Sequence, residues 1–254
     1  MNYTKLACVA SNSASAQGAL KLLKTHYDFV AVEDAQVIIA LGGDGFMLHC
    51  LHQYMQYNLP IYGINRGTVG FLMNSFSEEK LYQRVNEARC EKMHPLKMVA
   101  TMVNGKTRTE LAFNEVSLTR KSQQAANIGI IIDGKPRLDK LISDGILIAT
   151  PAGSTAYNLS VHGPIIPLGS SILALTPISP FRPRRWRGAL LPHNVTIELI
   201  NRDPEKRPIS AAADFHEVLD IKSVTVVEEQ QRYVTLLFDQ HHSLEERIIR
   251  EQFA

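Results

Sequence analysis

The pattern of apolar and polar positions changes in character near residue 95. Before that point, short apolar runs alternate with stretches whose apolar residues recur at helical spacing. Buried strands are predicted over 5–11, 35–43 and 59–65, and helices over 13–26, 44–55 and 77–88 with Ser77 as the N-cap of the last. Strands and helices in alternation predict a parallel α/β layer.

Beyond residue 95 the runs are short, rich in β-branched residues and separated by turn signals. The pairs Asn104-Gly105, Asp133-Gly134 and Asp144-Gly145 lie between alternating apolar residues, a pattern typical of hairpins. We therefore expect an α/β N-terminal domain with a parallel sheet over 1–94 and a β-rich C-terminal domain over 95–240. A capping box at Ser243 and Glu246 predicts a helix over 243–253, which is expected to pack back on the first domain.

Composition limits the class of protein. The chain has 254 residues, of which 45% are hydrophobic, enough for a sizeable core. A net charge of +2 is too small to indicate nucleic acid or an anionic membrane as a partner, and no apolar stretch reaches transmembrane length. Three widely spaced cysteines favour reduced thiols, so we expect a cytoplasmic protein.

Three glycines surround one acid at 42–45, directly after a predicted strand and before a predicted helix. Backbone amides without side chains at a helix N-terminus suit an anion such as a phosphate. The alternative is a plain glycine turn in which Asp44 caps the helix. The spacing does not match the dinucleotide fingerprint GxGxxG.

Two later stretches carry further candidate chemistry. Asn114 and Glu115 begin an apolar alternation, and they are either a base- and ribose-binding pair or a strand end with one polar residue outward. The stretch 143–167 is rich in small and hydroxyl residues. Ser154, Thr155 and Ser160 could donate hydrogen bonds and Tyr157 could stack, although a capped helix with ordinary packing is the alternative.

Other signals are weaker. The string NGKT at 104–107 ends like a Walker A loop, but Ala100 stands where the first glycine is needed, so a hairpin turn is predicted. His49 and His52 lack a second ligand cluster for zinc. The arginine-rich segment 182–187 around Trp186 could contact phosphates, a subunit or nucleic acid, or be a solvated loop. GxSxG and HExxH motifs are absent from the sequence, which gives hydrolase chemistry no support.

Together, GGDGF, the Asn-Glu pair and DGILIATPAGSTAYNLSVHGP resemble the motifs of the NAD kinase family, in the same order and at similar spacing. This resemblance implies a two-domain fold and transfer of the γ-phosphoryl of ATP, with a divalent metal such as Mg²⁺, to the 2′-hydroxyl of the adenosine ribose of NAD. It also implies a homodimer or homotetramer, with the dinucleotide bound between domains and partly across subunits. No membrane and no nucleic acid is expected as a partner.

The resemblance also implies roles for individual residues. Asp44 would orient or deprotonate the hydroxyl, and Gly42, Gly43 and Gly45 would admit phosphates. No metal ligand is assigned. The residues expected to contact NAD are Gly45, Phe71, Asn114, Glu115, Asp144, Thr155, Ala156, Tyr157 and Ser160, with Asp144 reaching the ligand of a neighbouring subunit.

Some positions depart from the family pattern. Phe46 stands where the family has Thr, Ala152 replaces Thr, Val161-His162 replace Ala-Gly, and Asp214-Phe215 stand where many members have Asp-Gly. Two other functions are therefore kept as alternatives. A kinase of a lipid or sugar hydroxyl would share the GGDG loop but lack the TPAGSTAY stretch, and a non-catalytic dinucleotide sensor is suggested by Phe46 alone.

Overall fold

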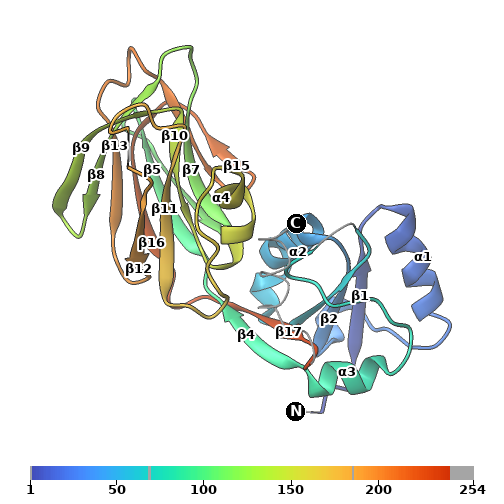
Figure 1. Cartoon of the computed structure of the whole chain (residues 1–254). Coiled ribbons are helices and arrows are strands. Elements are labelled where there is room, and N and C mark those ends of the chain that lie inside the picture. Colours follow the sequence, from blue (N-terminus) through green and yellow to red (C-terminus); the bar gives the residue numbers. More distant parts are fainter. Residues whose placement is uncertain (1, 68–69, 185, 241–254) are drawn as a thin grey trace. The chain divides into compact units, whose positions relative to one another are not determined.

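The computed structural model describes residues 2–67, 70–184 and 186–240. It separates into two compact units (Figure 1). One unit is His94–Arg232, and the other combines the chain up to Met93 with the segment that begins at Tyr233.

The first unit is built on a five-stranded sheet in which helices alternate with parallel strands. The sheet order is β1 (Leu6–Ala10), β2 (Val37–Gly42), β3 (Ile61–Asn65), β17 (Val234–Phe238) and β4 (Arg89–Met93). All neighbours are parallel except β4, which runs antiparallel at one edge. Every residue of β2 is buried, as expected for a strand covered on both faces. The parallel α/β layer is confirmed.

Helices α1 (Ala14–Leu23) and α3 (Leu81–Glu87) share one apolar cluster with one face of this sheet, including Tyr62 and Ile64 of β3. Gly63 lies between Tyr62 and Ile64 in β3, so it faces the other side of the sheet. Met47 of helix α2 (Asp44–Tyr54) fills the space beside Gly63, so α2 covers that opposite face. Helix α2 begins two residues after β2 ends, so the glycine loop lies at the carboxyl edge of the parallel strands, where α/β folds bind ligands.

The prediction of Ser77 as a helix N-cap was wrong. Helix α3 begins at Leu81 after Lys80, whose φ of 56° is left-handed, and the Ser77 hydroxyl instead accepts the N–H of Glu79 in a local turn at 3.2 Å. The N–H of Leu81 donates to the hydroxyl of Tyr27 at 3.1 Å. A residue distant in the sequence therefore supplies the partner that a local cap would have supplied.

Strand β17 lies in the first unit and not in the C-terminal domain expected over 95–240. It pairs with β3 and β4, and the buried Asn74 ties it down by donating to the carbonyls of Gly63 (3.0 Å) and Leu237 (2.9 Å). The apolar pattern of β17 is compatible with a sheet of either unit. The sheet that it joins is therefore decided by tertiary pairing. The helix expected over 243–253 lies outside the described residues.

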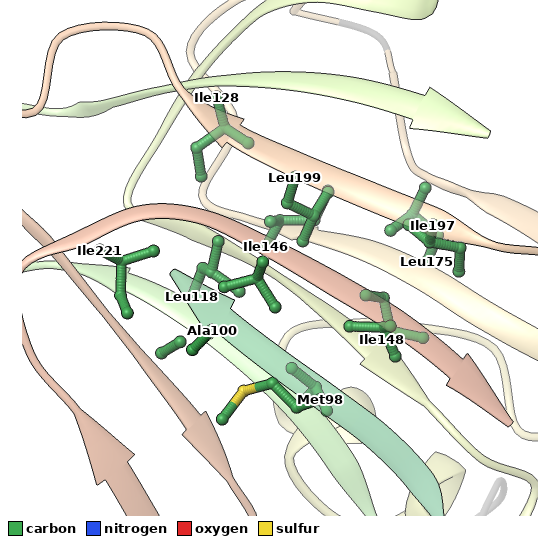
Figure 2. Packing of buried hydrophobic residues seen from close by; sticks show 14 of the residues in the cluster. Met98, Ala100, Leu118, Ile128, Ile146, Ile148, Leu175, Ile197, Leu199 and Ile221 are labelled. Carbon is green, nitrogen blue, oxygen red and sulfur yellow. The ribbon is translucent and has the colours of Figure 1, made fainter. Parts of the chain in front are cut away.

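The second unit contains two six-stranded sheets, both antiparallel. The first follows the order β6 (Thr107–Ala112), β5 (Leu96–Met102), β16 (Ile221–Glu228), β13 (Ile197–Asn201), β8 (Ala126–Ile132) and β9 (Lys135–Ser143). The second follows the order β12 (Ala189–Pro192), β11 (Ile172–Ile178), β10 (Gly145–Ala149), β7 (Glu115–Arg120), β14 (Ile209–Ala213) and β15 (His216–Val218). Figure 2 shows side chains of both sheets, such as Met98 and Ile146, meeting in one core. This confirms the β-rich C-terminal architecture.

Two of the predicted hairpins are confirmed and one is wrong. Asn104-Gly105 turns between β5 and β6, and Asp133-Gly134, with φ of 51° and 71°, turns between β8 and β9. Asp144-Gly145 instead carries the chain from β9 in one sheet to β10 in the other. Gly145 is needed there for close packing, because a Cβ would overlap the carbonyl oxygen of Leu118.

The cysteines are unpaired, in agreement with the expectation of reduced thiols. Burial raises the pKa of the Cys8 and Cys50 thiols to about 12, so neither is a reactive thiolate at neutral pH. Within the described residues, no helix combines the length and the apolar character needed to cross a membrane.

Candidate active site

The carboxylate of Asp44 is held by the backbone of a neighbouring loop and does not cap the helix that it begins. Its Oδ2 accepts the N–H of Phe71 at 2.7 Å, and its Oδ1 accepts the N–H of Leu72 at 3.1 Å. The N-cap of α2 is Gly43, with no side-chain capping bond. The reading of Asp44 as a simple cap is therefore wrong, and two amides fix the orientation of the carboxylate.

Gly70 makes this arrangement possible, because a Cβ at this position would lie 2.9 Å from Oδ1 of Asp44. Phe71 thus belongs to the same cluster as the glycine loop through its backbone, and its contact with NAD stays a prediction. Sequence reasoning missed Gly70 and Leu72. The glycine of GTVGFL could have signalled a close approach to another group.

The glycines of the loop serve different purposes. Gly45 is exposed and a Cβ there would meet nothing within 4 Å, so its backbone is accessible to a ligand. Gly43 lies against the backbone of Gly67, with a Cβ contact of 4.0 Å. At Gly42 a Cβ would be 2.7 Å from the Cβ and ring of Phe46, so Gly42 is needed to accommodate Phe46. The substitution of Phe for the family Thr therefore fills space beside the first glycine.

In the second unit, Asp214 organises the start of β7. Its carboxylate accepts three consecutive backbone N–H groups, from Phe113 (2.8 Å), Asn114 (3.0 Å) and Glu115 (3.2 Å). Asp214 adopts a left-handed φ of 51° between β14 and β15. A turn distant in the sequence thus fixes the backbone of the Asn-Glu pair, a role that the sequence analysis did not assign.

The side chain of Glu115 lies in a desolvated setting. Burial and, to a smaller extent, the nearby charge of Asp214 raise its pKa to about 7, against the opposing effect of a hydrogen bond from the backbone N–H of Tyr157. Its Oε2 is buried and has no hydrogen-bond partner among the described residues. An unsatisfied carboxylate oxygen of this kind is ready to accept a ligand hydroxyl.

The TPAGSTAY stretch packs closely on the same pair. The N–H of Thr150 donates to the carbonyl of Asn114 at 2.9 Å, and its hydroxyl donates to the carbonyl of Phe113 at 2.6 Å while accepting the N–H of Gly153 at 3.0 Å. A Cβ on Gly153 would overlap the carbonyl oxygen of Asn114. The two motifs are therefore one packed assembly, and its glycine permits backbone-to-backbone contact.

The expected helix in this stretch is replaced by a 3-10 turn, η3 (Ala152–Thr155), and a single turn of helix, α4 (Tyr157–Ser160). The hydroxyls of Ser154 and Thr155 donate to the carbonyls of Pro151 (2.6 Å) and Ala152 (3.3 Å). These bonds hold the compact turn, and donation by Ser154 and Thr155 to a ligand stays a prediction. Tyr157 and Ser160 are exposed, and Ala156 is half-buried.

Asn158 is a structural residue that the sequence analysis missed. It is fully buried, donates to the carbonyl of Pro164 at 2.8 Å and accepts the hydroxyl of Thr176 at 2.6 Å. A Cβ on Gly163 would overlap its side-chain amide. The buried amide holds α4 against β11, and with it the backbone N–H of Tyr157 that reaches Glu115.

Asp144 does not join this cluster. Gly145, which follows it, pairs with Thr119, whereas Ala149 at the other end of β10 pairs with Glu115. Asp144 instead forms an ion pair of 2.6 Å with Arg120. The acid is therefore at the opposite end of the strand from the Asn-Glu pair of its own chain.

No group of three or more His, Cys, Asp and Glu side chains that could hold a metal occurs within the described parts of the chain. A zinc site at His49 and His52 is thus unsupported. A Mg²⁺ ion that keeps waters and phosphate oxygens as ligands needs only one or two carboxylates, which fits a loop that offers Asp44 alone.

The comparisons with known proteins agree with these features. The chain matches the model of the ATP-NAD kinase N-terminal domain over residues 3–116 and that of the ATP-NAD kinase C-terminal domain over residues 100–233. It is 52% identical to the NAD kinase of Rhizobium meliloti over 252 residues, covering 99% of this chain and 98% of that protein. It is 54% identical to the NAD kinase of Brucella suis over 255 residues, covering 100% and 99%.

Solved structures show the same fold. Yeast NADH kinase complexed with NADH is similar with a TM-score of 0.85 and 22% identity, covering 100% of this chain and 88% of that one. An NAD kinase from Archaeoglobus fulgidus in complex with ATP is similar with a TM-score of 0.75 and 22% identity, covering 97% of both. The full-length identity to the curated relatives and the two family models show that the chain belongs to the NAD kinase family.

Proposed function

We propose that this protein transfers the γ-phosphoryl group of ATP to the 2′-hydroxyl of the adenosine ribose of NAD and so forms NADP. One observation carries the proposal: a single carboxylate, Asp44, is oriented by two backbone amides inside a glycine loop at the carboxyl edge of a parallel sheet. The curated relatives are named NAD kinase, which supports the choice of substrates.

In this proposal Asp44 accepts the hydrogen of the attacking hydroxyl and orients its oxygen. The amides of Phe71 and Leu72 hold the carboxylate in one rotamer, so the hydroxyl is positioned before reaction. The accessible backbone of Gly45 and the neighbouring Gly43 offer N–H groups to phosphate oxygens. Phosphoryl transfer needs mainly placement and charge neutralisation. The Asp44 carboxylate would place the hydroxyl, and the backbone N–H groups of the loop would stabilise the phosphate charge.

The second unit supplies groups that recognise the dinucleotide. The buried Oε2 of Glu115 lacks a partner among the described residues and would accept ribose hydroxyls, while the Asn114 side chain would read the edge of adenine. Exposed Tyr157 would stack on a ring. The further positions proposed to contact NAD are Phe71, Asp144, Thr155, Ala156 and Ser160.

A divalent cation would neutralise phosphate charge during the transfer. The described residues offer no closed cage, so such an ion would be held mainly by the ATP phosphates and water, with Asp44 as the carboxylate that the loop provides. We further propose that the enzyme is a cytoplasmic homo-oligomer. Asp144, which lies apart from the Asn-Glu pair of its own chain, would then contact the ligand of a neighbouring copy.

The test is a coupled assay in which NADP formed from ATP, Mg²⁺ and NAD drives an NADP-specific dehydrogenase. Replacing Asp44 by Asn keeps its size and an acceptor for one amide but removes the basic carboxylate. We expect the rate to fall by about 10²–10⁴-fold. Asp34→Asn is the matched control, because Asp34 is exposed in a 3-10 turn away from the glycine loop, and its activity should be unchanged.

Three outcomes would contradict the proposal. Equal rates for Asp44→Asn and the wild type would remove Asp44 from the reaction. Phosphorylation of a lipid or sugar with no NADP formed would favour a related hydroxyl kinase, and tight binding of NAD in calorimetry without turnover would favour a dinucleotide sensor.

A further inference from the structure

The loop that holds the Asp44 carboxylate leads directly to Asn74, a fully buried residue between two strands. Asn74 closely follows Phe71 and Leu72, whose N–H groups bond that carboxylate. We propose that Asn74 is a positioning residue for phosphoryl transfer, which keeps these two amides, and through them Asp44, in place. The inference rests on the proposed kinase function and gives that reaction a residue that does not touch the substrates.

The backbone of Asn74 occupies a gap between strands β3 and β17. These strands pair at Leu236 and Ile61, near the start of β3. Farther along β3, the N–H of Asn74 donates to the carbonyl of Gly63 at 2.8 Å, and its carbonyl accepts the N–H of Asn65 at 2.8 Å. Asn74 therefore pairs with the second half of β3 as a single residue of parallel strand.

The side chain of Asn74 completes the connection to β17. Its Nδ2 donates to the carbonyl of Leu237 at 2.9 Å and to that of Gly63 at 3.0 Å, while its Oδ1 accepts the N–H of Asp239 at 2.9 Å. A side-chain amide thus replaces the missing backbone pairing, because it carries both donors and an acceptor. An aspartate would lack the N–H donors and a leucine would lack every polar group, so this buried position selects asparagine.

The far side of this bridge is itself held firmly. The carboxylate of Asp239 forms an ion pair of 2.7 Å with Arg84 and accepts the hydroxyl of Tyr62. Arg84 also donates to the carbonyl of Ser75 at 2.8 Å, and Ser75 directly follows Asn74. The amide of Asn74 is therefore attached to a fixed point of the first unit.

The segment between Asn74 and the two amides is closely packed. Met73 is fully buried, and a Cβ on Gly63 would lie 2.7 Å from its Sδ and 3.3 Å from the carbonyl oxygen of Leu72. This packing leaves little room to absorb a shift of Asn74, so the shift would reach Leu72 and Phe71. A displacement of about 1 Å at a reacting group can lower a rate about 10²-fold.

The first test is Asn74→Ala, which removes the amide and leaves the backbone bonds of residue 74. We expect kcat for NADP formation to fall about 10–100-fold. The KM for ATP should stay within about twofold, because Gly42 of the glycine loop is held separately by the N–H of Arg66 at 2.7 Å.

Asn86→Ala is the matched control. The amide of Asn86 also joins two segments, donating to the carbonyl of Tyr3 at 3.1 Å and accepting its N–H at 2.6 Å. Tyr3 precedes β1, so this bridge lies at the opposite end of the sheet from the glycine loop. The control should lower the melting temperature and leave kcat unchanged.

Combination with Asp44→Asn separates positioning from a general loss of folded protein. A smaller folded fraction would lower the rate by the same factor in either background. If Asn74 acts through Asp44, Asn74→Ala should lower the residual rate of Asp44→Asn by less than about twofold.

Hydrogen exchange of the substrate-free protein, followed by mass spectrometry, reports on the loop without turnover. We expect residues 70–72 to exchange at least about tenfold faster in Asn74→Ala, with the buried strand β2 and the Asn86→Ala variant unchanged at these positions. If Asn74→Ala does not fold, Asn74→Asp is measured in its place, because it keeps the acceptor for the N–H of Asp239.

Three results would overturn the inference: a wild-type kcat in the Asn74 variant, an equal fall in kcat with and without Asp44, or unchanged exchange at 70–72. Absence of NADP formation by the wild type would contradict the proposed function alone. The exchange rates would then decide whether Asn74 holds the loop.

Discussion

The carboxylate of Asp214 and the backbone N–H of Glu115 are joined by a hydrogen bond of 3.2 Å, although 99 positions separate them in the sequence. The same carboxylate holds the two preceding amides, and its charge also acts on the Glu115 side chain. One turn between β14 and β15 thus fixes the backbone of the acid that we assign to ribose binding and, after burial, contributes to its raised pKa.

Glu115 should make the stability of the protein depend on pH. Burial and Asp214 raise its pKa from 4.5 to about 7, so between these values the folded state binds more protons than the unfolded state. The free energy of unfolding therefore falls as pH rises from 4.5 to 7, and the full stabilisation is present only below that window. Glu115→Gln should remove this dependence, a difference of roughly 1–3 kcal/mol between pH 5 and pH 8. Calorimetric melting of both proteins at the two pH values checks this, and parallel pH profiles would contradict it.

Replacing Asp214 by Asn should weaken NAD binding and shift its pH profile. Asn tolerates the left-handed conformation of this position, so the turn should persist while three charge-assisted bonds weaken. We expect the KM for NAD to rise about tenfold. Loss of the neighbouring charge should also lower the pKa of Glu115, moving the pH at which KM improves to more acidic values.

The measurement for this variant is the KM for NAD between pH 5.5 and 8. Asp139→Asn serves as the control, since Asp139 is largely exposed and its nearest basic group, on Arg202, is 3.9 Å away. A rise in KM with no shift along the pH axis would mean that Asp214 holds the backbone without influencing Glu115.

Gly153→Ala should damage the second unit. The new Cβ would overlap the carbonyl oxygen of Asn114, which already accepts the N–H of Thr150, so the two motifs would be forced apart. We expect a loss of about 1–3 kcal/mol and a higher KM for NAD, measured by thermal unfolding and the coupled assay. Gly18→Ala in α1 is the contrasting control, because a Cβ there meets nothing within 4 Å and alanine favours the helix. Equal behaviour of the two variants would contradict the close packing at Gly153.

Phe46→Thr should improve use of ATP at a cost in stability. Removing the ring that packs on Gly42 leaves space beside the loop, and we expect a loss of roughly 1–2 kcal/mol, less than for a fully buried phenylalanine. The added hydroxyl could donate a hydrogen bond to a phosphate oxygen of ATP, so the KM for ATP should fall several-fold. Donor panels of ATP and inorganic polyphosphate, with urea unfolding alongside, test both effects. An unchanged KM for both donors would show that the backbone amides alone contact the donor.

Local patterns in the sequence predicted much of this architecture. The apolar runs before residue 65 predicted the parallel strands, and two Asn-Gly and Asp-Gly pairs predicted hairpins, because period and turn chemistry act over a few residues. The motif around Asp44 was found for the same reason. A glycine-rich loop between a strand and a helix can be recognised from the local sequence, without knowledge of the residues that pack against it.

The errors share one physical cause. Ser77 was not needed as a cap because Tyr27, distant in the sequence, supplies an acceptor to Leu81. Asp144-Gly145 looked like a hairpin, yet the chain there passes between two sheets, since the pairing of β10 is decided by β7 and β11. Each outcome depends on a partner that local pattern does not contain.

The sequence by itself determined where strands, turns and the glycine loop lie, because hydrophobic period, turn preference and missing side chains are local properties. Tertiary structure alone decided that β17 joins the first sheet, that Phe71 and Leu72 hold Asp44, and that Asp214 holds Glu115. Those bonds satisfy backbone groups that would otherwise lie buried and unpaired, and only the folded chain brings their partners within reach.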